Sequence, residues 1–433
     1  MKFVGKNVVI YGAGASGRSA YELVREKGAK AIVYDDDGSV RQATNSKGVF
    51  ADADIIVLSP GVDGEKDFLL DAKLENKLVI GELELASRLC CAEQIAITGT
   101  NGKTTTTMLI DSIFKRAGEH SHAVGNVGTP FSSIADKLDA SEIAVIEASS
   151  FQLESAINFS PDTAVLLNIS PDHISRHKTL EKYINAKSKI FLNQGEQDYI
   201  VYNEDDEIIR GLTSQMVAQK VPFSLEHPTD GAYISSGFVC FRGKPIVALE
   251  DIDFQGKELQ NVLAAVSVCM LHGVSAYCTA SAITDFAKPK YRRERVDIID
   301  GISIYNDSKA TNVSACLCAC ECAGECALIL GGQRGSEDFD VLFSHMPSNV
   351  RYAVATGENS ADIISSARNN GFENVSECED LDKAFQTAFD FAKSEGLDSV
   401  LFSPSSKSFD KFRNFEERGK AFDVLVKKFK LKR

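Results

Sequence analysis

Short apolar runs alternate with amphipathic stretches of helical spacing along most of the chain. In the first part, the stretch Ser16–Lys27 has the spacing of a helix and separates two apolar runs. The strands expected there are Asn7–Tyr11, Lys30–Tyr34, Asp54–Ser59 and Leu78–Gly81. Alternation of this kind predicts a parallel sheet with helices on its faces.

The same alternation begins again twice further along the chain. A strand at Gln94–Thr98 and a helix from Thr104 to about Ala117 open the central part, where strands are also expected at Ile143–Glu147 and Thr163–Ile169. In the last part, strands are expected at Ala327–Gly331, Tyr352–Thr356 and Ser399–Ser403.

The composition excludes several classes of protein. The chain carries 47 Lys+Arg against 61 Asp+Glu, and a net charge of −14 argues against a general nucleic-acid or anionic-membrane binder. No apolar run approaches the roughly 18 residues of a transmembrane helix. The 11 cysteines, an odd number, fit reduced thiols. We therefore expect a cytoplasmic protein without nucleic-acid or membrane partners.

A first glycine-rich loop, Gly12-Ala-Gly-Ala-Ser-Gly17, lies between an expected strand and an expected helix, and Asp35 ends the next strand. This is the pattern of a dinucleotide-binding loop, because glycines allow a tight turn and the helix N-terminus attracts phosphate. Taken alone, it would predict an NAD(P)-dependent oxidoreductase. A tight turn that binds no cofactor has the same pattern, so the motif by itself leaves both interpretations open.

A second loop, Ile97-Thr-Gly-Thr-Asn-Gly-Lys-Thr104, also connects a strand to a helix and is a stronger signal. Its backbone N–H groups would surround phosphate oxygens, Lys103 would reach the β- and γ-phosphates, and Thr104 would bind Mg²⁺. It departs from the usual phosphate loop because Ile97 occupies the first glycine position. The pair of loops favours ATP over NAD.

These patterns predict a protein of the α/β class with three domains, the number that 433 residues suggest at about 150 residues per domain. We expect a Rossmann-like domain at residues 1–88, a central P-loop ATPase-type domain at 89–289 and a second Rossmann-like domain at 290–433.

Eight further motifs follow the second loop and, together with it, resemble the Mur ligase family, whose relatives include the folylpolyglutamate synthases. The resemblance spans nearly the whole chain. In order, the motifs are Glu147-Ala-Ser-Ser-Phe-Gln-Leu-Glu154, Asn168-Ile-Ser-Pro-Asp-His173, Tyr183-x-x-x-Lys187, Asn261-x-x-Ala-Ala265, Arg292-Arg-Glu294, Asn306-Asp-Ser-Lys-Ala-Thr-Asn312, Ser403-Pro-Ser-Ser-Lys-Ser-Phe409-Asp and Asn414-Phe-Glu-Glu-Arg-Gly419.

The resemblance implies an ATP-dependent amide-forming ligase. Such enzymes phosphorylate a carboxylate with ATP and pass the acyl group to an amine, releasing ADP and phosphate. The motifs SSFQLE, NDSKATN and GAGASG best fit the addition of D-glutamate to UDP-N-acetylmuramoyl-L-alanine in peptidoglycan precursor synthesis. The alternative is a related ligase that takes another amino acid, such as L-glutamate. The implied cofactors are ATP, two Mg²⁺ ions and a carbamylated lysine, without NAD, and we expect a monomer.

The resemblance also implies the ATP and metal contacts. Lys187 would carry the carbamate, since a neutral lysine that takes up CO₂ becomes an anion able to orient Mg²⁺; otherwise it would be a solvated lysine of a charged helix. The implied metal ligands are Thr104, Glu147 and His173. The implied ATP contacts are Gly99, Thr100, Asn101, Gly102, Lys103, Thr104, Thr105, Asn261, Arg292 and Asp307. The implied catalytic residues are Lys103, Glu147, His173, Lys187 and Lys309, and their joint presence argues against a non-catalytic descendant.

For the other substrates, the resemblance reassigns the first glycine loop from NAD to the diphosphate of UDP. The implied nucleotide-sugar contacts are Ala15 and Ser16 at the diphosphate, Asp35, Asp36, Ser59, Pro60 and Gly61 around uridine, and Asn126 at the muramoyl end. The implied glutamate contacts are Lys309, Thr311, Arg334, Ser408, Phe409 and Phe415, although ordinary core packing explains Phe415 nearly as well.

Three features leave alternatives open. His177 follows His173 at the spacing of a zinc pair on a helix, but the zinc-protease motif is absent. The five cysteines of Cys316–Cys326 would either bind a soft metal or be small packing residues of a helix. Lys407 stands beside the expected glutamate contacts where the family usually has a small residue, which leaves the identity and stereochemistry of the amino acid open.

Overall fold

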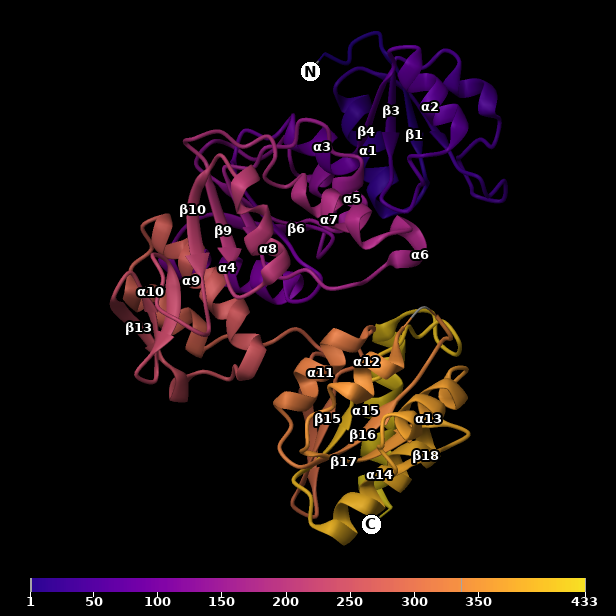
Figure 1. Cartoon of the computed structure of the whole chain (residues 1–433). Coiled ribbons are helices and arrows are strands. Elements are labelled where there is room, and N and C mark those ends of the chain that lie inside the picture. The colour runs from indigo at the N-terminus through magenta and orange to yellow at the C-terminus, as the bar shows by residue number, and fades with distance from the viewer. Residues whose placement is uncertain (1, 336, 433) are drawn as a thin grey trace. The chain divides into compact units, whose positions relative to one another are not determined.

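The computed structural model describes residues 2–335 and 337–432. The chain forms two compact units (Figure 1). Unit 1 comprises the chain up to Phe254 together with Leu259–Phe286, and unit 2 comprises Gln255–Glu258 together with the chain from Ala287 onward.

The first sheet of unit 1 is parallel and four-stranded. Its elements are β1 (Asn7–Tyr11), α1 (Ala15–Glu26), β2 (Lys30–Tyr34), η1 (Lys47–Phe50), β3 (Ile55–Leu58), α2 (Asp67–Leu74), β4 (Leu78–Gly81) and α3 (Glu82–Ser87). The strand order is β2-β1-β3-β4. Residues of β1 alternate between two buried faces, so that Ile10 packs with Leu23 of α1 and Tyr11 packs with Phe50. Burial on both faces explains the continuous apolar runs of these strands.

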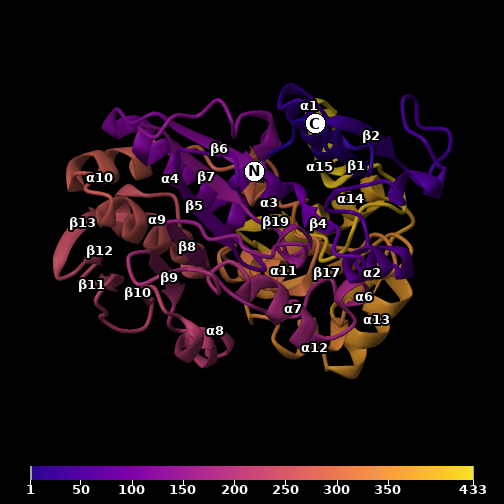
Figure 2. The same ribbon diagram turned by 90° about the horizontal axis from the view of Figure 1, so that it is seen from above.

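The second sheet of unit 1 is parallel and six-stranded, in the order β10-β9-β8-β5-β7-β6. Its elements are β5 (Glu93–Thr98), α4 (Lys103–Ala117), β6 (Ser121–Gly125), β7 (Ile143–Glu147), α5 (Ser150–Glu154), β8 (Thr163–Leu166), α6 (Ile174–His177), α7 (Leu180–Ser188), β9 (Tyr199–Asn203), α8 (Glu207–Leu212), β10 (Gln219–Phe223), α9 (Leu259–Leu271) and α10 (Ala276–Thr284). Ile95 and Ile97 of β5 pack in the cluster that α4 and α9 share, whereas Ala96 faces the cluster of α5 and α7. Figure 2 shows α4 and α9 side by side next to this sheet. Because β7 and β8 both pair with β5 in parallel, the carboxyl ends of these three strands lie together at one end of the sheet. This is the end at which parallel sheets bind ligands.

A small antiparallel sheet, β11 (Ala232–Ser235), β12 (Phe238–Phe241) and β13 (Lys244–Ala248), completes unit 1. It shares a core cluster with α4 and α9. Short 3₁₀ turns lie at Phe131–Ser133, Thr213–Gln215 and Leu249–Asp251.

Unit 2 has one six-stranded sheet in the order β14-β15-β19-β16-β17-β18, in which only β14 runs antiparallel to its neighbour. Helices cover both faces. Its elements are a 3₁₀ turn at Gly256–Glu258, β14 (Glu294–Ile299), β15 (Ile302–Asn306), α11 (Val313–Glu321), β16 (Cys326–Leu330), α12 (Phe339–Ser344), β17 (Val350–Ala355), α13 (Ser360–Asn369), β18 (Val375–Glu377), α14 (Leu381–Glu395), β19 (Ser399–Phe402) and α15 (Phe415–Leu431).

The predicted α/β class is confirmed, and each of the three larger sheets falls inside one predicted domain. Unit 2 resumes after Phe286, and the domain boundaries expected at 88 and 289 both stay predictions. β8 ends three residues earlier than expected. β8 ends at Leu166 because Asn168 turns to accept hydrogen bonds from the backbone of the second glycine loop. Within the described residues, no helix is both long and apolar enough to span a membrane.

The cysteines of the third part of the chain lie in and beside the core of unit 2. Cys316 and Cys320 on α11 and Cys326 on β16 are fully buried in one apolar cluster. Burial raises the pKa of the Cys326 thiol to about 12, so this side chain packs as a neutral group. Across residues 2–335 and 337–432, no three potential metal-binding atoms that include a cysteine converge. Packing thus accounts for Cys316, Cys320 and Cys326.

Candidate active site

The second glycine loop connects β5 to α4, as its sequence predicts. Gly102 has a left-handed φ of 86°, and a Cβ there would lie 2.2 Å from Oδ1 of Asn261. A Cβ on Gly99 would lie 2.9 Å from Cβ of Leu167. Asn168 holds the loop, since its carbonyl and Oδ1 accept the N–H groups of Thr100 and Asn101 at 2.9 and 2.8 Å. Larger side chains at Gly99 and Gly102 would thus collide with Leu167 and Asn261. The loop leads into the N-terminus of α4, a helix of 15 residues, and helix N-termini bind anions.

Two lysines meet at this loop. Lys103 donates from Nζ to the carbonyl oxygens of Gly99 and Thr100, at 2.8 and 2.9 Å. Lys187 of α7 donates to the same Gly99 oxygen at 2.6 Å. Lys187 is only 1% exposed, and burial, reinforced by the charge of Lys103, lowers its pKa well below the usual value. The site therefore favours the neutral amine of Lys187, which is the form that reacts with CO₂.

Glu147 ends β7 and is buried beside these lysines. Its Oε1 accepts a hydrogen bond of 2.7 Å from Nδ2 of Asn126, and its backbone carbonyl accepts the N–H of Asn126 at 2.9 Å. Its Oε2 is buried and has no hydrogen-bond partner in the described part of the chain. A buried carboxylate oxygen of this kind is costly unless a cation binds it, so the residue fits the expected Mg²⁺ ligand.

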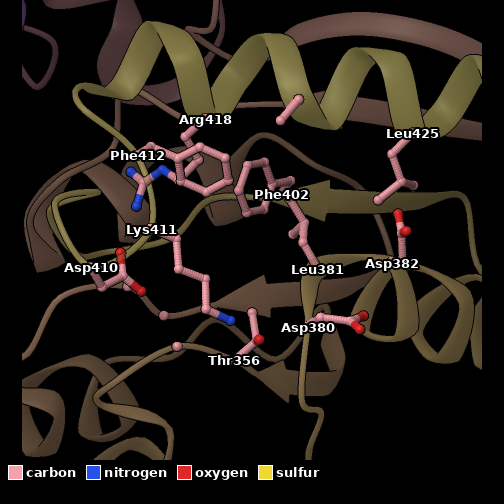
Figure 3. Close-up of a pocket in the computed structure, with 14 residues that line it drawn as sticks. Thr356, Asp380, Leu381, Asp382, Phe402, Asp410, Lys411, Phe412, Arg418 and Leu425 are labelled. Carbon is pink, nitrogen blue, oxygen red and sulfur yellow. The ribbon is translucent and has the colours of Figure 1, made fainter.

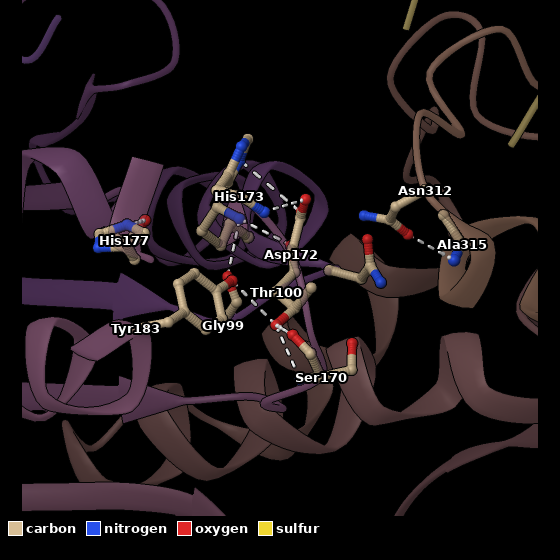
Figure 4. A network of polar contacts seen from close by, with 12 residues as sticks. Gly99, Thr100, Ser170, Asp172, His173, His177, Tyr183, Asn312 and Ala315 are labelled. Carbon is tan, nitrogen blue, oxygen red and sulfur yellow. Dashed lines mark hydrogen bonds and ion pairs between the residues drawn. The ribbon is translucent and has the colours of Figure 1, made fainter. Parts of the chain in front are cut away.

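The histidines have different surroundings (Figure 4). His173 has a left-handed φ of 54° at the start of α6, and its Nε2 lies 3.7 Å from Oδ2 of Asp172. His177 is buried, with Nε2 3.0 Å from Oγ of Ser150, and burial lowers its pKa. Both rings contact Phe151. Ser150 thus engages Nε2 of the buried His177, whereas His173 stays half-exposed.

The remaining expected ATP contacts of unit 1 surround the loop. Asn261 of α9 accepts a hydrogen bond of 3.2 Å from Oγ1 of Thr106 and lies against Gly102. Thr104 and Thr105 are buried in the first turn of α4. The hydroxyl of Thr100 contacts the Tyr183 hydroxyl at 3.0 Å (Figure 4).

The expected nucleotide-sugar residues gather around the first glycine loop. Oγ of Ser59 donates to the carbonyl of Gly12 at 3.0 Å, and Oδ2 of Asp35 accepts the N–H of Ala13 at 2.8 Å. Ala15 and Ser16 open α1. Pro60 and Gly61 follow Ser59 in the loop after β3, whereas Asn126 lies apart from this loop, against Glu147 at the end of β7.

In unit 2, Asp307 is buried and both of its carboxylate oxygens are engaged. Oδ1 accepts the N–H of Arg293 at 3.0 Å, and Oδ2 accepts the hydroxyl of Ser403 at 2.7 Å. Burial raises its pKa to about 7, against the opposing effects of Ser403 and of the Arg292 charge. Nε of Arg292 is buried without a hydrogen-bond partner among the described residues.

The expected glutamate residues divide into two groups. Nζ of Lys309 lies 5.4 Å from the ring centroid of Phe415, and Ser408 is buried. By contrast, Phe409 is 60% exposed, and Arg334 forms a surface ion pair of 2.9 Å with Asp362. Thr311 is half-buried just before α11.

Sequence reasoning gave no role to Arg418, which organises this part of unit 2. It is 3% exposed and donates to Oγ and the carbonyl of Ser308 at 3.0 and 2.8 Å and to the carbonyl of Ser406 at 2.9 Å. Arg418 thereby joins the loop after β15 to the loop after β19. It also borders a cavity of about 300 Å³ with Asp410, Lys411 and Phe402 (Figure 3). Its place in the Asn414–Gly419 motif was the available signal.

A glycine loop at a helix N-terminus, with two convergent lysines and a buried carboxylate, defines a nucleotide-phosphate site of the P-loop type in an α/β protein. Two family models match the chain, the Mur ligase middle domain over residues 97–269 and the Mur ligase, glutamate ligase domain over residues 291–406. The chain belongs to the Mur ligase family.

Curated relatives match over nearly the full length. UDP-N-acetylmuramoylalanine--D-glutamate ligase of Alkaliphilus metalliredigens is 35% identical, covering 98% of this chain and 99% of that protein. The ligase of the same name from Clostridioides difficile is 34% identical, covering 99% and 100%. Among solved structures, MurF from Acinetobacter baumannii aligns with a TM-score of 0.62 at 16% identity, covering 94% of this chain and 98% of that one. UDP-N-acetylmuramate-alanine ligase MurC from Thermotoga maritima aligns with a TM-score of 0.60 at 16% identity, covering 99% and 100%. Both share the fold.

Proposed function

We propose that this protein joins D-glutamate to UDP-N-acetylmuramoyl-L-alanine at the expense of ATP, through an acyl phosphate, with release of ADP and phosphate. The observation that carries the proposal is the 34–36% identity, over 97–99% of the chain, to ligases that bear this name. A related ligase that takes L-glutamate is the second candidate, because Lys407 departs from the usual small residue.

The loop Gly99–Thr104 holds the ATP phosphates through its N–H groups. Lys103 donates to the carbonyl oxygens of Gly99 and Thr100 within this loop, and in the proposal its ammonium group reaches the β- and γ-phosphates. The cation offsets the repulsion between ATP and the substrate carboxylate and stabilises the charge that develops on the transferred phosphoryl group. Asn261 and Thr105 border the same loop and support its shape.

Thr104, Glu147 and His173 are the residues that would hold Mg²⁺, with two ions expected. Magnesium bound there would neutralise phosphate charge and polarise the phosphoryl group. The unpaired Oε2 of Glu147 supports this assignment. The buried amine of Lys187 supports the proposal that it becomes a carbamate, because a buried neutral amine gains an anionic head beside the cations of the site.

In the proposed assignment, the glycine loop at α1 holds the UDP diphosphate, with the muramoyl end toward Asn126. Lys309 and Ser408 hold the glutamate carboxylates, and Thr311, Phe409 and Phe415 complete that pocket. Arg292 and Asp307 complete the ATP site, and Arg334 reaches glutamate once it leaves Asp362. The division into three domains at residues 88 and 289, a monomeric state and a cytoplasmic location belong to the same proposal.

The deciding experiment measures phosphate release with UDP-N-acetylmuramoyl-L-alanine, ATP and Mg²⁺, in parallel with D-glutamate, L-glutamate and other amino acids. Release that depends on D-glutamate supports the proposal. Preference for L-glutamate would replace it with the second candidate, and the absence of release with any amino acid would overturn the ligase assignment.

A further inference from the structure

One ion pair connects two loops of the first sheet in unit 1. The loop Asp35–Asp37 follows β2, and the loop Ser59–Lys66 follows β3. Nζ of Lys66 donates to Oδ2 of Asp36 at 2.7 Å and also to the hydroxyl of Tyr11. In the proposed function, these two loops border the uridine of the nucleotide sugar.

The carboxylate of Asp36 is an anchor in this arrangement. Its Oδ2 accepts hydrogen bonds from Lys66 and from the hydroxyl of Tyr11, and its Oδ1 accepts the hydroxyl of Tyr34 at 3.0 Å. The hydrogen bonds from Lys66 and then from Tyr11 hold the pKa of Asp36 at about 2. Asp36 is therefore charged throughout the physiological range, and both of its oxygens are used within the protein.

Other contacts hold the β3 loop on its remaining sides. Oγ of Ser59 bonds the first glycine loop, and a guanidinium N–H of Arg176, in α6, donates to the carbonyl of Val62 at 2.7 Å. Glu65 pairs with Lys182 of α7 at 3.1 Å. Lys66 adds the contact toward the loop after β2. Removing it would release the side of the β3 loop that faces Asp36 while the contacts toward α1, α6 and α7 remain.

We propose that Lys66 is a positioning residue of the nucleotide-sugar site, which fixes the loop after β3 against Asp36 and so orders both uridine-bordering loops before the substrate binds. The inference rests on the proposed function. A loop ordered in advance loses less conformational entropy on binding, so the contact acts on substrate affinity rather than on the chemical step. The side chain of Lys66 is not assigned to the reacting atoms.

The test compares Lys66→Ala with a matched control in the same sheet. Lys6 forms a similar ion pair with Asp54, at 2.8 Å. Because these two residues precede β1 and β3, their pair lies at the amino-terminal ends of the strands, opposite the loops that follow β2 and β3. Both variants remove one ammonium group and one Lys–Asp pair, so Lys6→Ala accounts for any general loss of stability or charge. Steady-state kinetics and direct titration with UDP-N-acetylmuramoyl-L-alanine are measured for each, with a thermal unfolding curve.

We expect Lys66→Ala to raise both KM and Kd for the nucleotide sugar about tenfold, with kcat and the KM for ATP unchanged within twofold. Lys6→Ala should leave all of these values unchanged. Asp36→Asn should reproduce the effect, and the double variant should be no worse than either single variant. Unchanged Kd in Lys66→Ala, or an equal change of kcat and of both KM values, would overturn the inference. A wild-type protein that does not bind the nucleotide sugar would instead contradict the proposed function, and this inference with it.

Discussion

Lys103 and Lys187 donate to the same acceptor, the carbonyl oxygen of Gly99, from two different helices. Two ammonium groups that share one acceptor repel each other, and the pKa of Lys187 is lowered by its burial first and then by the charge of Lys103. The site thus favours a neutral or modified amine at Lys187. In the proposed function, Lys103 is the cation that meets the ATP phosphates, and Lys187 is the amine that reacts with CO₂.

Lys187→Met should make the protein more stable at neutral pH. The folded state holds Lys187 with a lowered pKa, whereas the unfolded chain binds that proton up to about pH 10.5. The free energy of unfolding of the wild type therefore rises as pH rises from the folded-state pKa toward 10.5, and that of the variant lacks this contribution. Each unit of pKa difference corresponds to about 1.4 kcal/mol. Urea unfolding of both proteins between pH 6 and 10, in CO₂-free buffer, measures the difference.

Lys182→Met is the control for this comparison, because Lys182 lies on the same helix but is exposed and paired with Glu65. It should show no such pH trend. If the stability advantage of Lys187→Met were the same at every pH, the lowered pKa of Lys187 would not be its cause.

In assays of activity, Lys187→Met should lose turnover even when bicarbonate is added, whereas the wild type should gain activity from bicarbonate.

Lys103→Ala should abolish turnover, by about 10³-fold or more, because it removes the cation that offsets charge on the transferred phosphoryl group. Binding of the nucleotide sugar should stay within twofold of the wild type, since the expected contacts for that substrate surround the other glycine loop. Phosphate-release kinetics and calorimetric titration measure the two effects. A collapse of nucleotide-sugar binding would show that the two loops do not have separate ligands.

Much of the fold was predictable because parallel strands are buried on both faces and therefore have continuous apolar runs, which stand out in the sequence. β1, β2, β4 and β7 have the expected bounds. The end of β8 was not predictable, because it depends on Asn168, which leaves the strand to hold a loop almost seventy residues earlier in the chain. A contact of that kind has no local signal.

The site was predictable where a motif places the reacting group and its support together, as in the loop Gly99–Thr104. It was less predictable where the support lies far away in the sequence. Arg418 holds Ser308 across 110 residues, and Asn126 holds Glu147 from the adjacent strand end. Arg334 is expected to contact glutamate, and in the structure its side chain pairs with Asp362 on the surface. Its role stays a prediction.

Glu147→Gln should lower kcat by roughly 10²- to 10³-fold and raise the Mg²⁺ concentration needed for half-maximal activity. Glutamine keeps an oxygen for Nδ2 of Asn126 and replaces the unpaired Oε2 with an uncharged group. The protein should therefore stay folded, with a melting temperature no lower than that of the wild type. Glu142→Gln, just before the same strand, is the control and should retain activity within twofold. Unchanged Mg²⁺ dependence in Glu147→Gln would rule out this carboxylate as a metal ligand.

Asp307→Asn should be more stable than the wild type above pH 7 and nearly equal to it near pH 4. Burial raises the pKa of Asp307 from 3.8 to about 7, so the folded state holds a proton that the unfolded chain has already released in this range. The corresponding stabilisation is fully present below about pH 4 and is lost as pH rises through 7. The shift corresponds to roughly 4 kcal/mol at most. Asparagine resembles the protonated carboxyl group and can keep an oxygen for the N–H of Arg293.

Denaturant unfolding of Asp307→Asn and of the wild type at pH 4, 5, 6, 7 and 8 measures this difference. Asp54→Asn provides the opposite sign, because the hydrogen bond from Lys6 lowers the pKa of Asp54. The stability that Asp54 contributes is present above its unfolded pKa and is lost on acidification. The free energy of unfolding of Asp54→Asn should therefore lie furthest below that of the wild type at neutral pH. If the free energies of unfolding of Asp307→Asn and of the wild type differed by the same amount at every pH from 4 to 8, the Asp307 carboxyl group would not titrate in that range. In the proposed function it would then enter the ATP site as an anion, and the ATP contact expected of it would form without any change of protonation.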